Sequence, residues 1–137
     1  MPPARRESEP LPVHYAIYRE QRLVISTALG RLTFAEVKEH QNQLLNDPEF
    51  NPEFNQLLDL SAVTDMDLSI DEAKMAARRR MFSPASRRAI LASRPAIYGM
   101  GRLLGAHHEL AEGSSQVGIF YDLPSALEWL GLDSLPR

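Results

Sequence analysis

Two capping boxes constrain the fold of this 137-residue chain more than any other feature. Thr33-Phe-Ala-Glu36 and Ser69-Ile-Asp-Glu72 each place a hydroxyl three residues before a carboxylate, so that the two side chains can satisfy the free amides of a helix start. The first box predicts a helix that stops before Asn46-Asp-Pro48, because the residue before a proline disfavours the helical region. The second predicts a helix that ends at Ser83-Pro84 and buries a narrow apolar stripe, namely Ile70, Ala73, Ala77 and Met81.

Segments with strand character alternate with these helices. Residues 13–19 alternate in polarity and residues 22–28 are β-branched and apolar, which predicts an antiparallel hairpin whose second strand ends at Gly30. Residues 56–60 predict a short buried strand, followed by a loop rich in acids. Further strands are predicted at residues 88–92 and 116–121, a third helix at residues 95–111, and a last helix after Asp122.

The predicted order of elements is therefore β-β-α-β-α-β-α-β-α. Alternation after the first hairpin indicates βαβ units with right-handed crossovers. We expect an α/β fold in which a mixed β-sheet is packed by about four helices.

The composition is that of an ordinary globular protein. The length suits one domain, and four prolines within residues 1–12 predict a flexible tail ahead of a single domain over residues 13–137. The absence of cysteine excludes disulfides, cysteine nucleophiles and thiolate metal sites. Because the start lacks the apolar core of a signal peptide and no apolar run reaches membrane-spanning length, we expect a cytoplasmic protein without a membrane span.

The stretch that contains the second capping box resembles the signature of a known family. Asp59-Leu60-Ser61-Ala62-Val63 and Met66-Asp67-Leu68-Ser69 match, in order and spacing, the pattern of STAS domains, the bacterial anti-sigma-factor antagonists of the SpoIIAA-like fold. The resemblance implies that fold. Further phrases resemble a divergent, largely uncharacterised STAS-like branch that is related in shape to the CRAL-TRIO lipid-transfer fold: Gly30-Arg-Leu-Thr33, Ser86-Arg-Arg-Ala-Ile90, Tyr98-Gly-Met-Gly-Arg102 and Ala126-Leu-Glu-Trp-Leu130.

The resemblance makes Ser69 a candidate phospho-acceptor. A partner kinase phosphorylates the antagonists at the second serine of Met-Asp-Ser-Ser-Gly, whose place Ser69 takes here, while Leu68 and Ile70 replace the neighbouring serine and glycine. A phosphate would meet free amides and the positive end of a helix dipole, but nearby acids would repel it. The alternative is that Ser69 is only a helix cap. Candidate contacts to a protein partner are Asp67, Leu68, Asp71 and Glu72.

A block of eight basic residues without an acid runs from Lys74 to Arg102. One interpretation is a solvated helix end, in which arginines complement the macrodipole. The others are a site for a small anion or lipid headgroup and a contact with an acidic protein surface. Nucleic acid is not expected, because the whole chain carries a net charge of -3. Candidate anion-binding residues are Arg78, Arg79, Arg88 and Arg102.

These observations favour a non-catalytic regulatory or protein-interaction module, switched at the helix start that carries Ser69. The spacing shows no serine-histidine-acid arrangement, and we expect no catalytic activity, no cofactor and no metal. The alternative is a carrier or sensor that binds a lipid or other apolar anionic ligand between the third helix and the sheet. A protein partner is expected, and a homodimer is compatible with the sequence.

Overall fold

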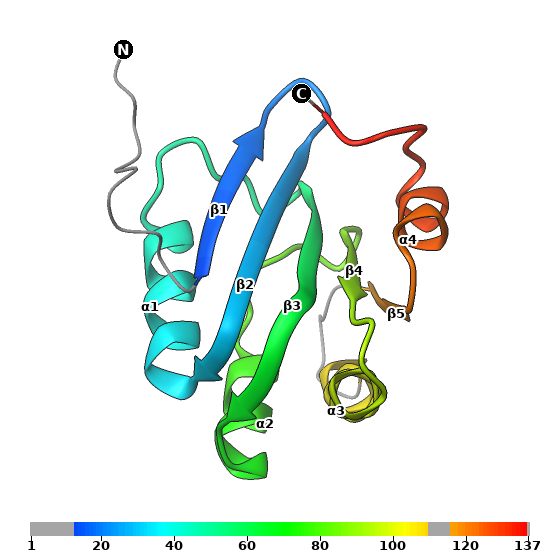
Figure 1. Ribbon diagram of the computed structural model, residues 1–137. Coiled ribbons are helices and arrows are strands. Elements are labelled where there is room, and N and C mark those ends of the chain that lie inside the picture. Colours follow the sequence, from blue (N-terminus) through cyan, green and yellow to red (C-terminus); the bar gives the residue numbers. More distant parts are fainter. Residues whose placement is uncertain (1–12, 110–115, 137) are drawn as a thin grey trace, which may run out of the picture.

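A five-stranded mixed sheet forms the centre of the computed structural model, which describes residues 13–109, without the side chains of residues 104–109, and residues 116–136 (Figure 1). The strands lie in chain order; β1 and β2 are antiparallel and all other neighbours are parallel. The predicted mixed sheet is thus confirmed, whereas the predicted tail lies outside the described residues. The strands are β1 (Val13–Tyr18), β2 (Leu23–Thr33), β3 (Asn55–Asp67), β4 (Arg87–Leu91) and β5 (Gln116–Phe120).

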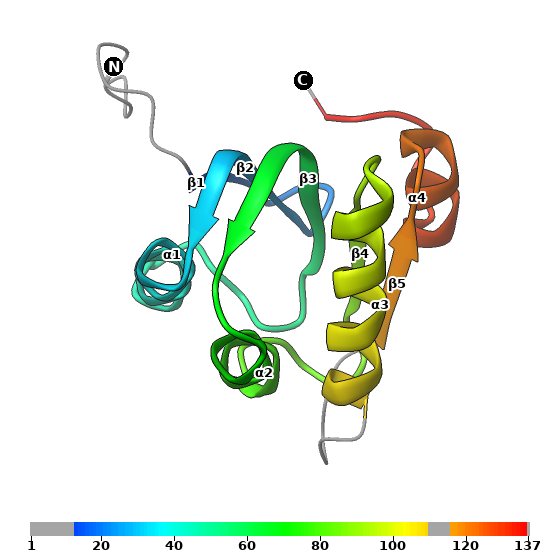
Figure 2. The same cartoon turned by 60° about the horizontal axis from the view of Figure 1, so that its bottom comes forward.

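Four helices in the described part of the chain cover the two faces of the sheet unequally. Helices α1 (Phe34–Leu45), α2 (Ile70–Arg78) and α3 (Pro95–Glu109) lie on one face, and α4 (Leu123–Leu130) lies on the other (Figures 1 and 2). The topology dictates this arrangement. Parallel strands that follow one another across a sheet, joined by right-handed crossovers, place every connecting helix on the same side.

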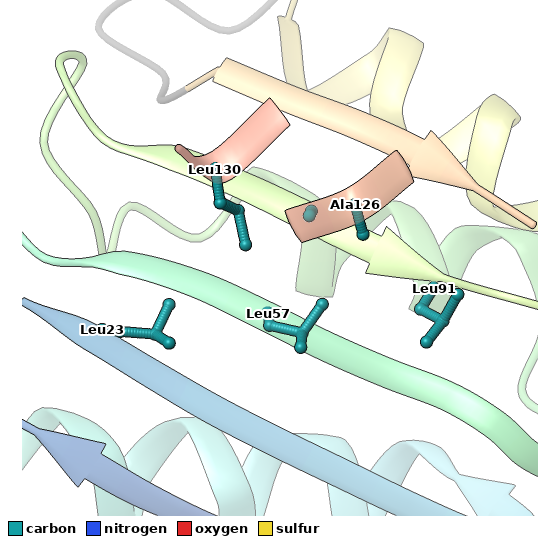
Figure 3. Packing of buried hydrophobic residues seen from close by; sticks show 6 residues of the cluster. Leu23, Leu57, Leu91, Ala126 and Leu130 are labelled. Atoms are coloured by element: carbon teal, nitrogen blue, oxygen red, sulfur yellow. The ribbon is translucent and has the colours of Figure 1, made fainter. Parts of the chain in front are cut away.

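Alternation along the strands divides the core between these two faces. Leu57 and Leu91 point toward α4, where they pack with Ala126 and Leu130 (Figure 3). The preceding or following residues on the same strands point the other way, because successive side chains of a strand face opposite sides of a sheet. The residues of β3 and β4 that alternate with Leu57 and Leu91 therefore lie beneath α1, α2 and α3.

Both predicted capping boxes are present. The Thr33 hydroxyl accepts a hydrogen bond from the Glu36 amide at 3.3 Å, and the Glu36 carboxylate accepts one from the Thr33 amide at 2.9 Å. The same pair of bonds joins Ser69 and Glu72, at 3.0 Å and 2.9 Å. Ser69 is therefore the N-cap of α2, as the sequence predicts.

Two strand boundaries differ from the prediction. β2 does not end at Gly30 but passes through it, with Gly30 at φ +63° and with shifts of register on either side. The extended β2 pairs with an extended β3 as far as Thr33 and Asp67. Asp65 and Asp67 therefore lie on a strand and not, as predicted, in a loop.

Helix α2 is shorter than predicted. It ends at Arg78, because the backbone of Arg79 is extended, with ψ at 126°. Met81 lies beyond the helix and is still buried, beside Phe82 in the core under α1. Ile70, at the other end of the predicted stripe, is 51% exposed. The stripe is thus not one buried helix face, because its first residue is exposed and its last lies beyond the helix.

Candidate functional site

A cavity of about 140 Å³ lies between the sheet and helices α1, α2 and α3. Most of its wall is apolar, because the inward side chains of β2, β3 and β4 meet small residues on α2. Among the described side chains of α3, Gly101 alone lines it. The apolar lining includes Ala28, Leu58, Leu60 and Ile90 from the sheet and Val37, Ala73, Ala76 and Ala77 from the helices.

Polar side chains from the centre of the sheet also line the cavity. Gln56 is buried on β3, where its Nε2 donates to Ser26 Oγ at 3.0 Å. Its Oε1 accepts from Arg88 Nε, also at 3.0 Å. The chain of bonds runs from β4 across β3 to β2, and it holds the Arg88 guanidinium in place on the sheet.

Arg88 is a cation in the cavity wall that has no charged partner among the described residues. Its guanidinium lies 4.7 Å from the centre of the Phe82 ring. Across residues 13–109 and 116–136, no described carboxylate is within ion-pair distance of it, and its two Nη atoms have no hydrogen-bond partner. Burial lowers the pKa of Arg88 to about 10, so the group remains charged at neutral pH.

His40 on α1 contributes a second unpartnered polar group to the cavity wall. Its side chain is only 8% exposed, and no described group accepts from or donates to either ring nitrogen. The Tyr15 ring packs edge-on against it, with 5.5 Å between the ring centres. Burial, followed by the charges of Arg88 and His14, lowers the pKa of His40 to about 4, so the imidazole is neutral at physiological pH.

Gln41, the neighbour of His40, joins α1 to α2. Its Nε2 donates to the Ala76 carbonyl at 3.1 Å, and its Oε1 accepts from Arg79 Nη1 at 3.4 Å. Because Gln41 and Ala76 both line the cavity, this contact fixes the position of α2 over the site.

The residues predicted to meet a protein partner lie around the start of α2. Ser69 and Asp71 are exposed, and Glu72 completes the capping box. Asp67 pairs with Arg31, with Nη2 and Oδ2 2.6 Å apart, and sequence reasoning missed this ion pair. Leu68 is different, because it is half-buried and lines the cavity.

The four arginines predicted to bind an anion do not form one site. Arg88 lines the cavity, whereas Arg79 bonds to Gln41 at the C-terminal end of α2. Arg78 and Arg102 are exposed, on α2 and α3 respectively. Only Arg88 is therefore placed to meet a ligand inside the fold.

Sequence reasoning also missed His40, Gln41 and Gln56. A signal was present, since Gln41 occupies an apolar position of the helical repeat and Gln56 begins a strand that is predicted to be buried. A polar side chain at such a position is buried and needs a partner. That partner could not be identified before the strands were placed.

The described residues contain no group of three or more histidine, aspartate or glutamate side chains that could hold a metal ion. None of the described helices is both long and apolar enough to cross a membrane.

Comparison with known proteins identifies the fold. No family model matches the chain, and no curated protein matches it. A solved structure that resembles it is an uncharacterised protein of the DUF3478 family with a SpoIIAA-like fold, from Shewanella loihica. The two share 21% identity and a TM-score of 0.58, over 91% of this chain and 98% of that one. The SpoIIAA-like fold implied by the sequence resemblance is thus confirmed.

Proposed function

We propose that this SpoIIAA-like domain is a cytoplasmic, non-catalytic binding module, a carrier or sensor whose site is the cavity beneath α1, α2 and α3. The observation that supports the proposal is the unpartnered His40 in a largely apolar wall. Leaving a buried polar atom without a hydrogen bond costs about 1–3 kcal/mol. A ligand in the cavity offsets that cost.

The size of the cavity supports the same function. Protein interiors are close-packed, so a cavity of this volume leaves apolar side chains without contacts that a ligand could supply. An apolar cavity of about 150 Å³ is large enough to bind benzene. A small apolar molecule therefore fits between the sheet and the helices without any rearrangement of the fold.

Binding of toluene tests the cavity without involving its charged group. We expect toluene to shift the methyl NMR signals of Leu58, Leu60 and Ile90 in a saturable manner. Ala76→Leu adds carbon atoms to the cavity wall and should abolish the shifts, whereas Ala35→Leu, on the exposed face of α1, should preserve them. Equal shifts in both variants, or none in the wild type, would contradict the proposal.

The surface at the start of α2 supports a second candidate function, the contact with a regulatory protein partner. Ile70 and Met75 are 51% and 62% exposed although both are apolar, and Ser69 beside them is exposed. Apolar side chains next to a serine suit a contact that phosphorylation would weaken, because the phosphate adds about -1.5 to -2 charges.

Mass spectrometry of the protein isolated from its own cells tests this second function. We expect a phosphopeptide that carries the modification at Ser69 under at least one growth condition. An unmodified Ser69 under all conditions would exclude the phosphorylation switch, and it would leave the cavity proposal intact.

A further inference from the structure

We infer that the cavity selects a small monocarboxylate, with its carboxylate on Arg88 and His40 and an apolar body of about six carbons beside Leu58 and Ile90. This inference rests on the proposed binding function and names the class of ligand. Three properties of the site support this class of ligand: its charge, its hydrogen-bonding groups and its volume.

The charge of the site requires one negative charge from the ligand. Arg88 carries a positive charge among apolar side chains, and the described part of the chain gives it no carboxylate. An uncompensated charge in such surroundings is costly. A carboxylate compensates it one for one, whereas a phosphate monoester brings about -1.5 to -2 charges against a single cation.

The geometry of the guanidinium suits a carboxylate as well. Nε is already bonded to Gln56, which fixes the plane of the group on the sheet. The two Nη atoms keep their N–H donors, and a planar fork of donors matches the two oxygens of a carboxylate. Arg88 therefore has its binding atoms oriented before the ligand arrives.

His40 adds a neutral donor to this cation. A neutral imidazole carries one N–H, and neither nitrogen of His40 has a partner among the described residues. His40 and Arg88 line the same cavity. A carboxylate held there by Arg88 would share the cavity with a donor that lacks an acceptor among the described residues.

The volume limits the rest of the ligand. At about 140 Å³ the cavity holds a body of benzene size. A short-chain or aromatic acid fits, but the chain of a membrane lipid does not. The inference therefore favours a small soluble acid over the lipid that the sequence resemblance suggests.

Isothermal titration with hexanoate, hexan-1-ol and dodecanoate tests the inference. We expect hexanoate to bind about tenfold more tightly than hexan-1-ol, because the carboxylate forms an ion pair with Arg88 and the hydroxyl does not. Arg88→Met should remove this preference. Arg102→Met makes the same change of charge on an exposed residue and should behave as the wild type.

Each remaining outcome contradicts a defined part of the account. Equal affinities of the wild type for hexanoate and hexan-1-ol would overturn the carboxylate while the cavity proposal stands. Dodecanoate binding more tightly than hexanoate would overturn the limit on size and favour a lipid. No binding of these probes or of toluene would overturn the proposed function itself. If Arg88→Met does not fold, the comparison of the three probes on the wild type decides alone.

Discussion

The proposed binding function depends most on His40, a buried residue whose ring nitrogens have no hydrogen-bond partner among the described residues. Its position on α1 buries the ring against Tyr15, but the part of the protein described here supplies neither nitrogen with a partner. The imidazole is consequently held neutral, and protonation opposes folding. If the residue served only to fill space, leucine or phenylalanine would stabilise the protein more, because neither leaves a buried nitrogen without a hydrogen bond.

The first prediction at this scale concerns pH. Because the pKa of His40 is about 4 when folded and 6.5 in the reference state, the unfolded chain binds the proton first as pH falls. The free energy of unfolding should therefore decrease between about pH 7 and about pH 5, with His40 contributing about 2 kcal/mol of the loss. His40→Leu should remove this contribution. Urea denaturation at both pH values measures it, and an equal loss in the variant would contradict the burial of a neutral imidazole.

The second prediction concerns the cap of α2. Ser69→Ala removes the acceptor for the Glu72 amide and should lower the free energy of unfolding by about 1 kcal/mol. Ser69→Asp keeps an acceptor and should stay close to the wild type. Thr33→Ala at α1 is the matched control and should cost a similar amount. A Ser69→Ala variant as stable as the wild type in chemical denaturation would show that the cap is not formed in solution.

At the scale of elements, the helix starts could be predicted from the sequence, but the pairing of the strands and hence their lengths could not. A capping box involves four consecutive residues, so Ser69 and Thr33 mark helix starts without knowledge of the rest of the chain. The length of β3 depends instead on its pairing with β2 beyond Gly30, which is a contact between distant segments. The extended backbone after Arg78 likewise follows from the burial of Met81 and Phe82 rather than from helix propensity.

Two glycines provide a prediction at this scale. Gly30 has a φ of +63°, so Gly30→Ala should strain β2 and cost about 1 kcal/mol, although no atom lies within 4 Å of the added Cβ. Gly99 in α3 has equal space and no such φ, so Gly99→Ala should instead stabilise the protein by up to about 1 kcal/mol. Thermal unfolding of the two variants should give shifts of opposite sign. A stabilising effect at Gly30 would contradict the left-handed backbone conformation of this residue.

At the scale of the whole molecule, the order of strands and helices followed from the sequence, but the cavity did not. The order rests on patterns within each segment. The cavity forms where three helices meet the sheet, and it brings together residues as distant in the sequence as His40 and Arg88. The arginine block is visible in the sequence as a cationic feature. Only the strand register, however, shows that Arg88 faces inward while neighbouring arginines of the block are exposed.

If both proposals hold, α2 links the binding site to the partner surface. Helix α2 forms part of the cavity wall with Ala73, Ala76 and Ala77, and it also carries the exposed Ile70 and Met75. A ligand that changes the position of α2 would also change the surface offered to a protein partner. Binding of the ligand in the cavity would then control binding of the protein partner through a movement of α2.

A crystal structure of the protein grown with hexanoate would show whether the cavity is a site for a small carboxylate. We expect the carboxylate to lie within hydrogen-bonding distance of the Arg88 Nη atoms and of a nitrogen of His40, with the carbon chain between Leu58 and Ile90. A hexanoate found only on the outer surface, while the cavity is filled by water or by rearranged side chains, would contradict it.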